Sequence, residues 1–314
     1  MKTWHTLQLS LLLFGVLTTA KLSAQPTQAA SKQDLDGPPK IAATVDGYPI
    51  SITAAQRLLK HSLPNQERAA QEPMLIETAI ARLIDRRVVY QYLVANGGAA
   101  GKNAVQVEVE GLERELAKIE QSLDGYLVRQ QLTREELEFE IEWKISWNRY
   151  LQTSLTDEFL EQHFQQHQRQ FDDSEMRVAH LLIKTDDRVS VDQALAKATG
   201  IVADLKANNV TWDEAVSKHS AAPTRNTGGE MGWIRYDEPM PPEFSTAAFR
   251  LAVGEISPPV ATAFGVHLIK CLELRTGKTG WRDALDRVRE HATRSLFKKL
   301  ATEHRSKVSI KIQP

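Results

Sequence analysis

The feature of this 314-residue sequence that most constrains the fold is an apolar stripe close to its C-terminal end. Between residues 281 and 300, apolar side chains recur at three- and four-residue spacing, as on one face of a helix: Trp281, Leu285, Val288, Ala292, Leu296 and Leu300. A helix with such a stripe exposed to water is not stable by itself. We therefore expect residues 281–314 to pack on another helical part of the chain, and the alternating "VSIKI" within them to be a strand.

A helical region with which this segment could pack lies between residues 41 and 172. It opens on "IAATVDGYPIS", a β-prone run interrupted by an Asp46-Gly47 turn, which predicts a strand for "VSIKI" to pair with. Helical periodicity follows. Pro73 suits the first turn of a helix, and Asn96-Gly97-Gly98 is typical of a helix end.

A later helix of this region carries an aromatic stripe. Thr133 followed by Glu136 is the capping-box pattern that opens it, and Phe139, Trp143 and Trp147 follow at four-residue intervals on one face. Such a stripe can pack against neighbouring helices, which is its commoner use, or line a groove for unfolded peptide. The sequence leaves both interpretations open.

The pattern changes between residues 175 and 276, where short β-prone runs alternate with short helical ones. "MRVAHLLIK" and "FGVHLIKCLEL" are typical of strands, Thr211 with Glu214 is a capping-box pattern, and "PPEFSTAAFRLAVGEI" predicts a short helix closed at Gly254. This order indicates an α+β domain of about one hundred residues. We expect it to be an insertion in a mainly α-helical domain whose two parts are residues 41–172 and 281–314.

Residues 1–24 are typical of a secretory signal peptide. Lys2 precedes an apolar run that is too short to span a bilayer, and small residues follow near Leu22-Ser23-Ala24. Residues 25–40 are polar and contain Pro and Gly, which predicts a flexible lead into the mature protein. We therefore expect a periplasmic or secreted protein with no stable membrane span after signal cleavage.

Charge argues against a nucleic-acid-binding protein, and cysteine content excludes a fold stabilised by intramolecular disulfides. The formal net charge is −1 and no basic tract is present, which argues against a nucleic-acid partner. Cys271 is the single cysteine, so no intramolecular disulfide can form. Its alternating surroundings predict a small core residue rather than a catalytic thiol.

Four runs in the α+β domain carry a family resemblance. In chain order they are "RVAHLLIK", "GGEMGW", "MPPEFSTAAF" and "VGEISPPVATAFGVHLIK". Their order and spacing resemble a parvulin-type peptidyl-prolyl cis-trans isomerase domain over residues 175–276. The resemblance implies a small antiparallel sheet with surrounding helices. The flanking helical segments and the N-terminal leader look like those of the SurA-type and PrsA-type extracytoplasmic foldases.

The resemblance implies a site that needs no cofactor and no metal. His180 and His267 would lie side by side on neighbouring central strands as catalytic residues. The substrate-binding residues that it implies around the proline ring are Met240, Phe244, Phe264 and Thr262. Phe and Met provide apolar area of adaptable shape, and two histidines can hold a fixed hydrogen-bond arrangement by matching their tautomers.

The loop before "GGEMGW" both matches the family and departs from it. Gly228 and Gly229 match the family's paired glycines, which permit backbone conformations closed to other residues. The third residue after the preceding helix is usually an Asp or Cys of the catalytic set, and here it is Ala222, which cannot hydrogen-bond through its side chain. Thr224 or Asn226 could supply a polar group instead. Activity would survive reduced if apolar binding dominates, and would suffer more if that polar group tunes the twisted carbonyl.

Two specialised uses of the domain are disfavoured. Zinc sites need three or four ligands, and the predicted histidine pair supplies two, to which His219 and Glu230 could be added. Selectivity for phosphorylated Ser/Thr-Pro needs a basic cluster in the loop after the first strand. That loop reads "KTDDRVSVD", which is mixed and slightly acidic.

These features predict an exported peptidyl-prolyl cis-trans isomerase and folding chaperone that acts on X-Pro bonds of unfolded client proteins. An alternative is a holdase whose parvulin domain is weak or inactive and only binds extended peptide. A third possibility is an assembly factor with one dedicated partner, which would have no general affinity for peptides.

Overall fold

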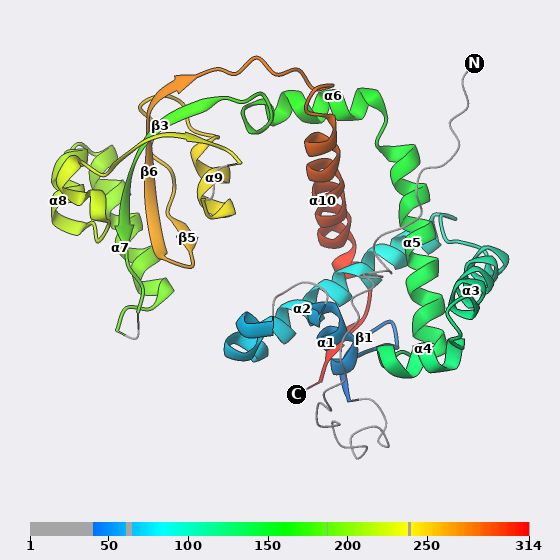
Figure 1. Cartoon of the computed structure of the whole chain (residues 1–314). Helices are drawn as coiled ribbons and strands as arrows, with labels where there is room; N and C mark the ends of the chain where they lie inside the picture. Colours follow the sequence, from blue (N-terminus) through cyan, green and yellow to red (C-terminus); the bar gives the residue numbers. More distant parts are fainter. Residues whose placement is uncertain (1–39, 61–64, 187, 238–239, 314) are drawn as a thin grey trace. The chain divides into compact units, whose positions relative to one another are not determined.

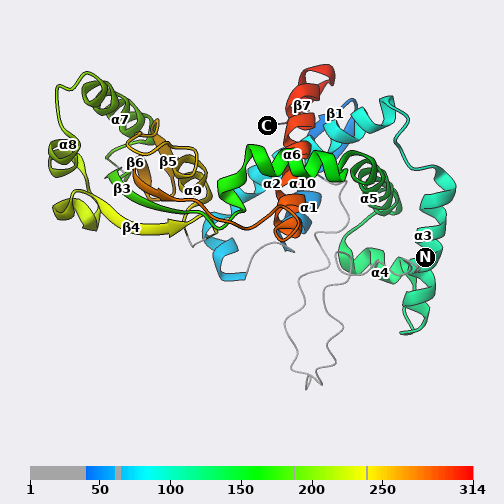
Figure 2. The same ribbon diagram turned by 90° about the horizontal axis from the view of Figure 1, so that it is seen from above.

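The computed structural model describes residues 40–60, 65–186, 188–237 and 240–313, without the side chains of residues 65–72 (Figures 1 and 2). The predicted signal peptide and nearly all of the predicted lead at 25–40 lie outside these ranges. Within them, no helix combines the length and the apolar character that crossing a bilayer requires.

The described chain opens on a β-hairpin that also receives the last strand. β1 (Ile41–Val45) and β2 (Tyr48–Ser51) are antiparallel, and Asp46 and Gly47 between them have φ values of 47° and 81°. These left-handed values are those that a tight Asp-Gly hairpin turn requires. β7 (Ile310–Ile312) pairs antiparallel with β1, which gives a three-stranded sheet of order β2-β1-β7.

In the described ranges six α-helices lie between β2 and residue 167: α1 (Ile52–Lys60), α2 (Asn65–Ala95), α3 (Lys102–Ala117), α4 (Leu123–Gln130), α5 (Arg134–Ser154) and α6 (Asp157–Gln166). Because α2 already begins at Asn65, Pro73 lies inside it and the prediction that Pro73 opens a helix is wrong. A helix-interior proline costs about 3 kcal/mol. Residues further along α2, such as Leu83 and Val88, are buried against β1 and α1, and such packing outweighs local propensity.

Trp143 and Trp147 of the aromatic stripe of α5 pack on the C-terminal helix α10 (Leu285–His304), which begins four positions after Trp281, whereas Phe139 meets Tyr90 of α2 edge-on. Thr133 and Glu136 form the predicted capping box at the start of α5. The rings of Trp143 and Trp147 are stacked, with centroids 5.5 Å apart, and both meet Phe297 of α10 edge-on. Packing is therefore what the structure assigns to these two tryptophans.

A four-stranded antiparallel sheet of order β4-β3-β6-β5 forms the α+β domain (Figure 1). Its elements are β3 (Glu175–Ile183), α7 (Val191–Lys206), α8 (Trp212–His219), the 3-10 turn η3 (Pro223–Thr227), β4 (Glu230–Arg235), α9 (Pro242–Ala248), β5 (Val260–Thr262) and β6 (Gly265–Arg275). α9 ends well before Gly254, so the predicted closure there is wrong. The Gly254 N–H donates to Cys271 O at 2.8 Å, which ties this segment to β6 instead.

The alternation of side chains along the strands divides the core of this domain in two. Ala179 and Leu181 of β3 pack with α7 and α8, whereas Met176 and Val178 belong to the cluster under α9. His180 and His267 have the parity of the α9 side. Cys271 is fully buried in the α9 cluster, which is the core position predicted for it.

Candidate active site

The two predicted histidines meet on the α9 face of the sheet. β3 and β6 are paired with His180 opposite Ile269 and Leu182 opposite His267, so the histidines are diagonal neighbours across two strands. Their Nδ1 atoms are 3.2 Å apart and their rings are stacked, with centroids separated by 5.4 Å. Phe244 of α9 presents its ring to both, nearly perpendicular to each.

The Thr262 hydroxyl extends the pair into a chain of three side chains. Its Oγ1 lies 2.9 Å from His267 Nε2, accepts from the Phe264 N–H at 3.1 Å and is 3.3 Å from Gly265 O. If the hydroxyl donates to Gly265, His267 carries its proton on Nε2 and accepts at Nδ1 from His180. If the hydroxyl donates to His267 Nε2 instead, His267 carries its proton on Nδ1 and donates it to Nδ1 of His180. Either way, the Thr262–His267 and His267–His180 contacts each have one donor and one acceptor.

Both imidazoles are neutral at pH 7. Burial lowers the pKa of His180, and burial together with the neighbouring His180 lowers the pKa of His267 to about 4. Only 9% of His180 and 5% of His267 is exposed. A neutral pair can donate and accept hydrogen bonds in fixed directions, and it supplies no positive charge to a bound carbonyl.

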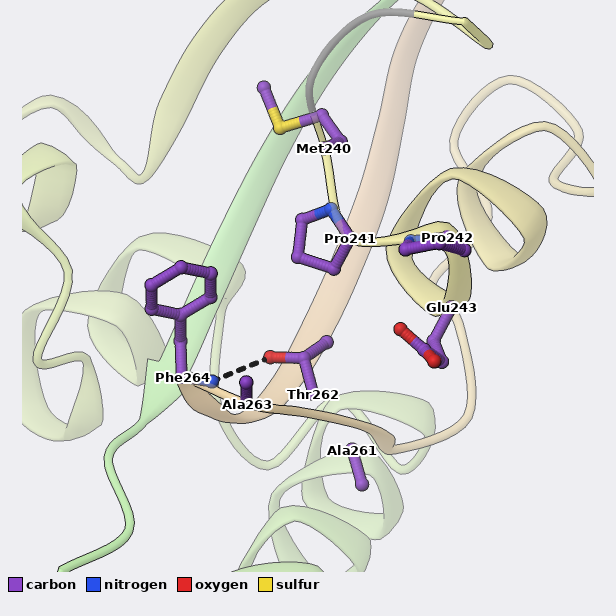
Figure 3. A pocket seen from close by; sticks show the side chains of 8 residues that line it. All are labelled: Met240, Pro241, Pro242, Glu243, Ala261, Thr262, Ala263 and Phe264. Atoms are coloured by element: carbon purple, nitrogen blue, oxygen red, sulfur yellow. Dashed lines mark hydrogen bonds between the residues drawn. The ribbon is translucent and has the colours of Figure 1, made fainter. Parts of the chain in front are cut away.

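A cavity of about 600 Å³ opens between the end of β5 and the start of α9 (Figure 3). Met240 and Pro241 lie on the segment that leads into α9, and Pro242 is the first residue of that helix. Thr262 ends β5, and Phe264 lies in the turn between β5 and β6. The Phe264 side chain is 64% exposed. A large aromatic ring held in solvent is available to cover an apolar ligand.

The four predicted substrate-binding residues therefore do not all line this cavity. Met240, Thr262 and Phe264 line the cavity, whereas Phe244 does not. Phe244 is 1% exposed and belongs to the core cluster under α9. In this conformation it supports the two imidazoles and has no surface to offer to a ligand.

Gly228 and Gly229 bring the loop against β3 at His180. Both have left-handed φ values, of 65° and 79°. Gly229 O accepts from the His180 N–H at 2.9 Å, and Gly228 O accepts from the Trp212 indole N–H at 2.9 Å. A Cβ on Gly229 would lie 2.2 Å from His180 O, so this approach requires glycine.

Ala222 is buried beside β3, at 5% exposure. The Ser220 hydroxyl accepts from the N–H groups of Ala222 and Leu182, both at 3.2 Å, and this fixes the position of the loop. Thr224, which we considered as a polar substitute, has a buried Oγ1 with no hydrogen-bond partner in the described part of the chain. Asn226 lies in η3 and is exposed.

Glu230 and His219, the two additional metal ligands that the sequence offers for the histidine pair, have other neighbours in the structure. Glu230 pairs with Arg177 at 3.2 Å. His219, at the end of α8, has its pKa lowered by burial and by the nearby Lys197 and Lys218. A second histidine cluster, His163, His167 and His291, lies outside this domain and is not among the predicted sites; its signal in the sequence is "HFQQH" at 163–167, which places two histidines one helical turn apart.

Comparison with known proteins defines the class of this domain. Residues 180–273 match the family described as "Rotamase: PPIC-type PPIASE domain". This span contains the histidine pair, the glycine loop and the cavity. The chain therefore contains a parvulin-type peptidyl-prolyl isomerase domain, with the α+β fold of a small antiparallel sheet and surrounding helices.

The curated relatives are named chaperones. The chain is similar to "Chaperone SurA" of Shigella dysenteriae serotype 1 (strain Sd197), with 36% identity over 103 residues, which is 32% of this chain and 24% of the relative. For "Chaperone SurA" of Bordetella parapertussis the values are 34% over 124 residues, 40% of this chain and 23% of the relative. The chain thus spans about a quarter of the length of these relatives.

Solved structures that this chain matches include a peptidylprolyl isomerase (PrsA) from Bacillus anthracis. It shares 21% identity, covers 72% of this chain and 94% of its own, and has a TM-score of 0.37. A PpiC-type isomerase domain shares 26% identity over 34% of this chain and 96% of its own, with a TM-score of 0.32.

Proposed function

We propose that this protein is a peptidyl-prolyl cis-trans isomerase and folding chaperone that acts on X-Pro bonds of unfolded clients. The observation that carries the proposal is the neutral, hydrogen-bonded chain Thr262–His267–His180 set beside a cavity walled by Met240 and Phe264. The match of residues 180–273 to the PPIC-type family supports the same reaction.

The chemistry requires little beyond a shaped pocket. Rotation about an amide bond has a barrier of about 18–20 kcal/mol, and X-Pro bonds interconvert in tens to hundreds of seconds. Bringing this to sub-second times takes a reduction of about 3–4 kcal/mol, at about 1.36 kcal/mol per tenfold in rate. No bond to the enzyme has to form. A pocket that fits the twisted amide better than the planar one lowers the barrier by differential binding.

In this proposal each group of the site has one task. Met240, Pro241 and Phe264 hold the proline ring through apolar contact. His180 and His267 supply directional hydrogen bonds and exclude water next to the rotating amide. Phe244 acts as a positioning residue, because its ring contacts both imidazoles from the core side.

A holdase is the second candidate, and the specific observation that favours it is Ala222. Its methyl group occupies a buried position where parvulins usually carry Asp or Cys, and it offers no hydrogen bond to a twisted carbonyl. Thr224, two positions after Ala222 in η3, has a buried hydroxyl without a hydrogen-bond partner in the described part of the chain, and this is the polar group that would compensate.

The division of labour and the compartment are further parts of the proposal. Residues 41–172 and 281–314 would form one chaperone-like helical domain that binds extended client segments, and residues 175–276 would form the isomerase. Pairing of β7 with β1 and packing of α10 on α5 support this division. The charged, apolar and small residues in order at 1–24 support export to the periplasm or the medium.

A proline-limited refolding assay tests the isomerase. We expect the full chain to accelerate refolding catalytically, and the His267→Gln variant to lose at least about tenfold in kcat/KM, or about 1.4 kcal/mol of transition-state stabilisation. Binding of the same client without acceleration would reject the isomerase and leave the holdase.

The Ala222→Asp variant separates a weakened isomerase from a binding module. A large gain in kcat/KM identifies the alanine as the limiting feature, and Thr224→Val should then remove most of the residual activity of the natural chain. Suppression of client aggregation provides the control measurement. A holdase predicts suppression that is unchanged in His180→Ala and Met240→Ala and is lost on deletion of residues 41–155.

A further inference from the structure

A second group of histidines lies outside the parvulin domain, where α6 meets α10. His163 is in the last turn of α6, His167 is the residue that caps its C-terminal end, and His291 is on α10. One ring nitrogen of each lies within 4.8 Å of the others. His163 Nε2 and His291 Nδ1 are 2.8 Å apart. Three imidazoles thus converge on one point from two helices.

The packing of α6 on α10 explains why these rings converge. The one-turn spacing of His163 and His167 puts both on one face of α6. Leu160 and Phe164, on either side of His163, are buried in a cluster with Val288 and Ala292 of α10, and Ala292 is the neighbour of His291.

The rings are also held by aromatic neighbours. Phe159 stacks on His163, with centroids 6.0 Å apart, and Phe171 meets His291 edge-on at 5.5 Å. His163 is 7% exposed. His167 and His291 are half-buried, so the packing of this junction holds His163 in the core and the other two rings at its edge.

All three rings are neutral, which is the form that binds metals. Burial, with His167 nearby, lowers the pKa of His163 to about 4, and burial with the other two rings lowers that of His291 to about 4. Burial and the charge of Arg250 lower the pKa of His167. Each neutral imidazole has one bare nitrogen, and a neutral imidazole is the commonest protein ligand for transition metals.

A buried amide oxygen supplies an independent sign of a ligand. Gln170 is 7% exposed, and its Oε1 is buried without a hydrogen-bond partner in the described ranges. Gln170 lines a cavity of about 570 Å³ together with His167 and His291. A buried carbonyl oxygen without a hydrogen-bond partner is unfavourable, and coordination or a coordinated water would satisfy it. The same cavity provides a route from solvent.

We propose that His163, His167 and His291 bind one divalent transition-metal ion of the Zn²⁺ class, with Gln170 or a water in the fourth position. Zn–N bonds of about 2.0–2.1 Å in a tetrahedral site put ligand nitrogens about 3.3–3.4 Å apart. Small ring rotations reach this arrangement from the separations present. The His163–His291 hydrogen bond is replaced by two metal bonds.

The electrostatic surroundings of the site have opposite effects on a bound cation. The C-terminal end of α6, where His167 lies, favours a cation. Arg250 and Arg294 oppose one, although Arg294 is paired with Glu290. The ion would join the helix that precedes the parvulin domain to the helix that follows it. Binding to the folded form alone would therefore stabilise this junction.

Calorimetric titration of the untagged full chain with Zn²⁺ tests the proposal. We expect one equivalent to bind, and each of His163→Gln, His167→Gln and His291→Gln to weaken the Kd by at least about 100-fold, since loss of even an outer partner costs about 10–100-fold. Matched controls are His219→Gln, a single histidine, and His267→Gln, which breaks the other pair. Both should bind Zn²⁺ as the unmodified chain does.

Two further measurements keep the test decisive. Co²⁺ added to the unmodified chain should give the intense visible absorption of a four-coordinate site, which does not depend on any variant folding. Arg250→Gln combined with Arg294→Gln should tighten Zn²⁺ binding, because two opposing charges are removed. Absence of stoichiometric uptake, or uptake that survives loss of all three histidines, would overturn the site.

Discussion

A methyl group added at Gly229 tests whether close approach of the glycine loop holds His180 in place. The Cβ of Gly229→Ala would lie 2.2 Å from His180 O, 1.2 Å short of the 3.4 Å at which ordinary contact begins. The obstacle is backbone, so no side-chain rotation relieves it. Either the loop or β3 must move, and the His180 N–H to Gly229 O hydrogen bond at 2.9 Å is lost with the movement.

Gly228→Ala is the matched control. It imposes the same left-handed backbone cost, about 1–2 kcal/mol for a residue with a Cβ. Its Cβ would meet only the Asp213 carboxylate at 3.1 Å, which is the end of a flexible side chain. Gly229→Ala adds a lost hydrogen bond of about 1 kcal/mol and the displacement of a strand. We therefore expect losses of about 1–2 kcal/mol for Gly228→Ala and at least about 3 kcal/mol for Gly229→Ala.

Urea unfolding followed by tryptophan fluorescence measures both losses, and proline-limited refolding measures activity in the folded protein. Because Gly229→Ala moves His180, its kcat/KM should fall at least about tenfold below that of Gly228→Ala. If the two variants match in both stability and activity, the close approach at Gly229 has no role in holding the site and the reasoning fails.

Three further predictions concern the histidine chain and the cavity. Thr262→Val removes the partner of His267 Nε2 and should lower kcat/KM about tenfold while costing no more than about 1–2 kcal/mol of stability; unchanged kinetics would separate the hydroxyl from the reaction. Phe264→Ala should raise KM with a stability change within about 0.5 kcal/mol, since the ring is largely exposed; a stable variant with the KM of the natural chain would remove Phe264 from the substrate site. The pKa of His267 is about 4 in the folded protein against 6.5 for the free side chain, so the unfolded chain binds more protons between these values. Its contribution, up to about 3 kcal/mol, is present above pH 6.5 and lost as the pH falls toward 4, and urea unfolding across this range should have a smaller pH dependence in His267→Gln.

Local signals in the sequence predicted several elements with their ends. Thr133 with Glu136 and Thr211 with Glu214 are capping boxes in the structure, because both partners of each bond lie within one helical turn. The Asp46-Gly47 turn depends on two adjacent residues in the same way. Local signals gave wrong helix boundaries where tertiary packing favoured a different structure. Pro73 lies inside α2, whose buried residues further along the helix keep it folded.

The candidate site was predicted through resemblance, and its details depended on packing. The pairing of His180 with His267 was expected, whereas the continuation to Thr262 Oγ1 follows from the turn between β5 and β6. Phe244 and Phe264 could not be told apart by residue type. Their positions in α9 and in an exposed turn leave one at 1% exposure and the other at 64%.

The sequence alone determined where helices are capped, where the hairpin turns and which strand residues share a face, because each of these depends on groups within a few positions of one another. Only the tertiary structure decided which distant groups meet. His180 and His267 are 87 positions apart, and His163 and His291 are 128 apart. A one-residue change in strand register would send His267 to the opposite face of the sheet, so these encounters follow from the register and packing of whole elements.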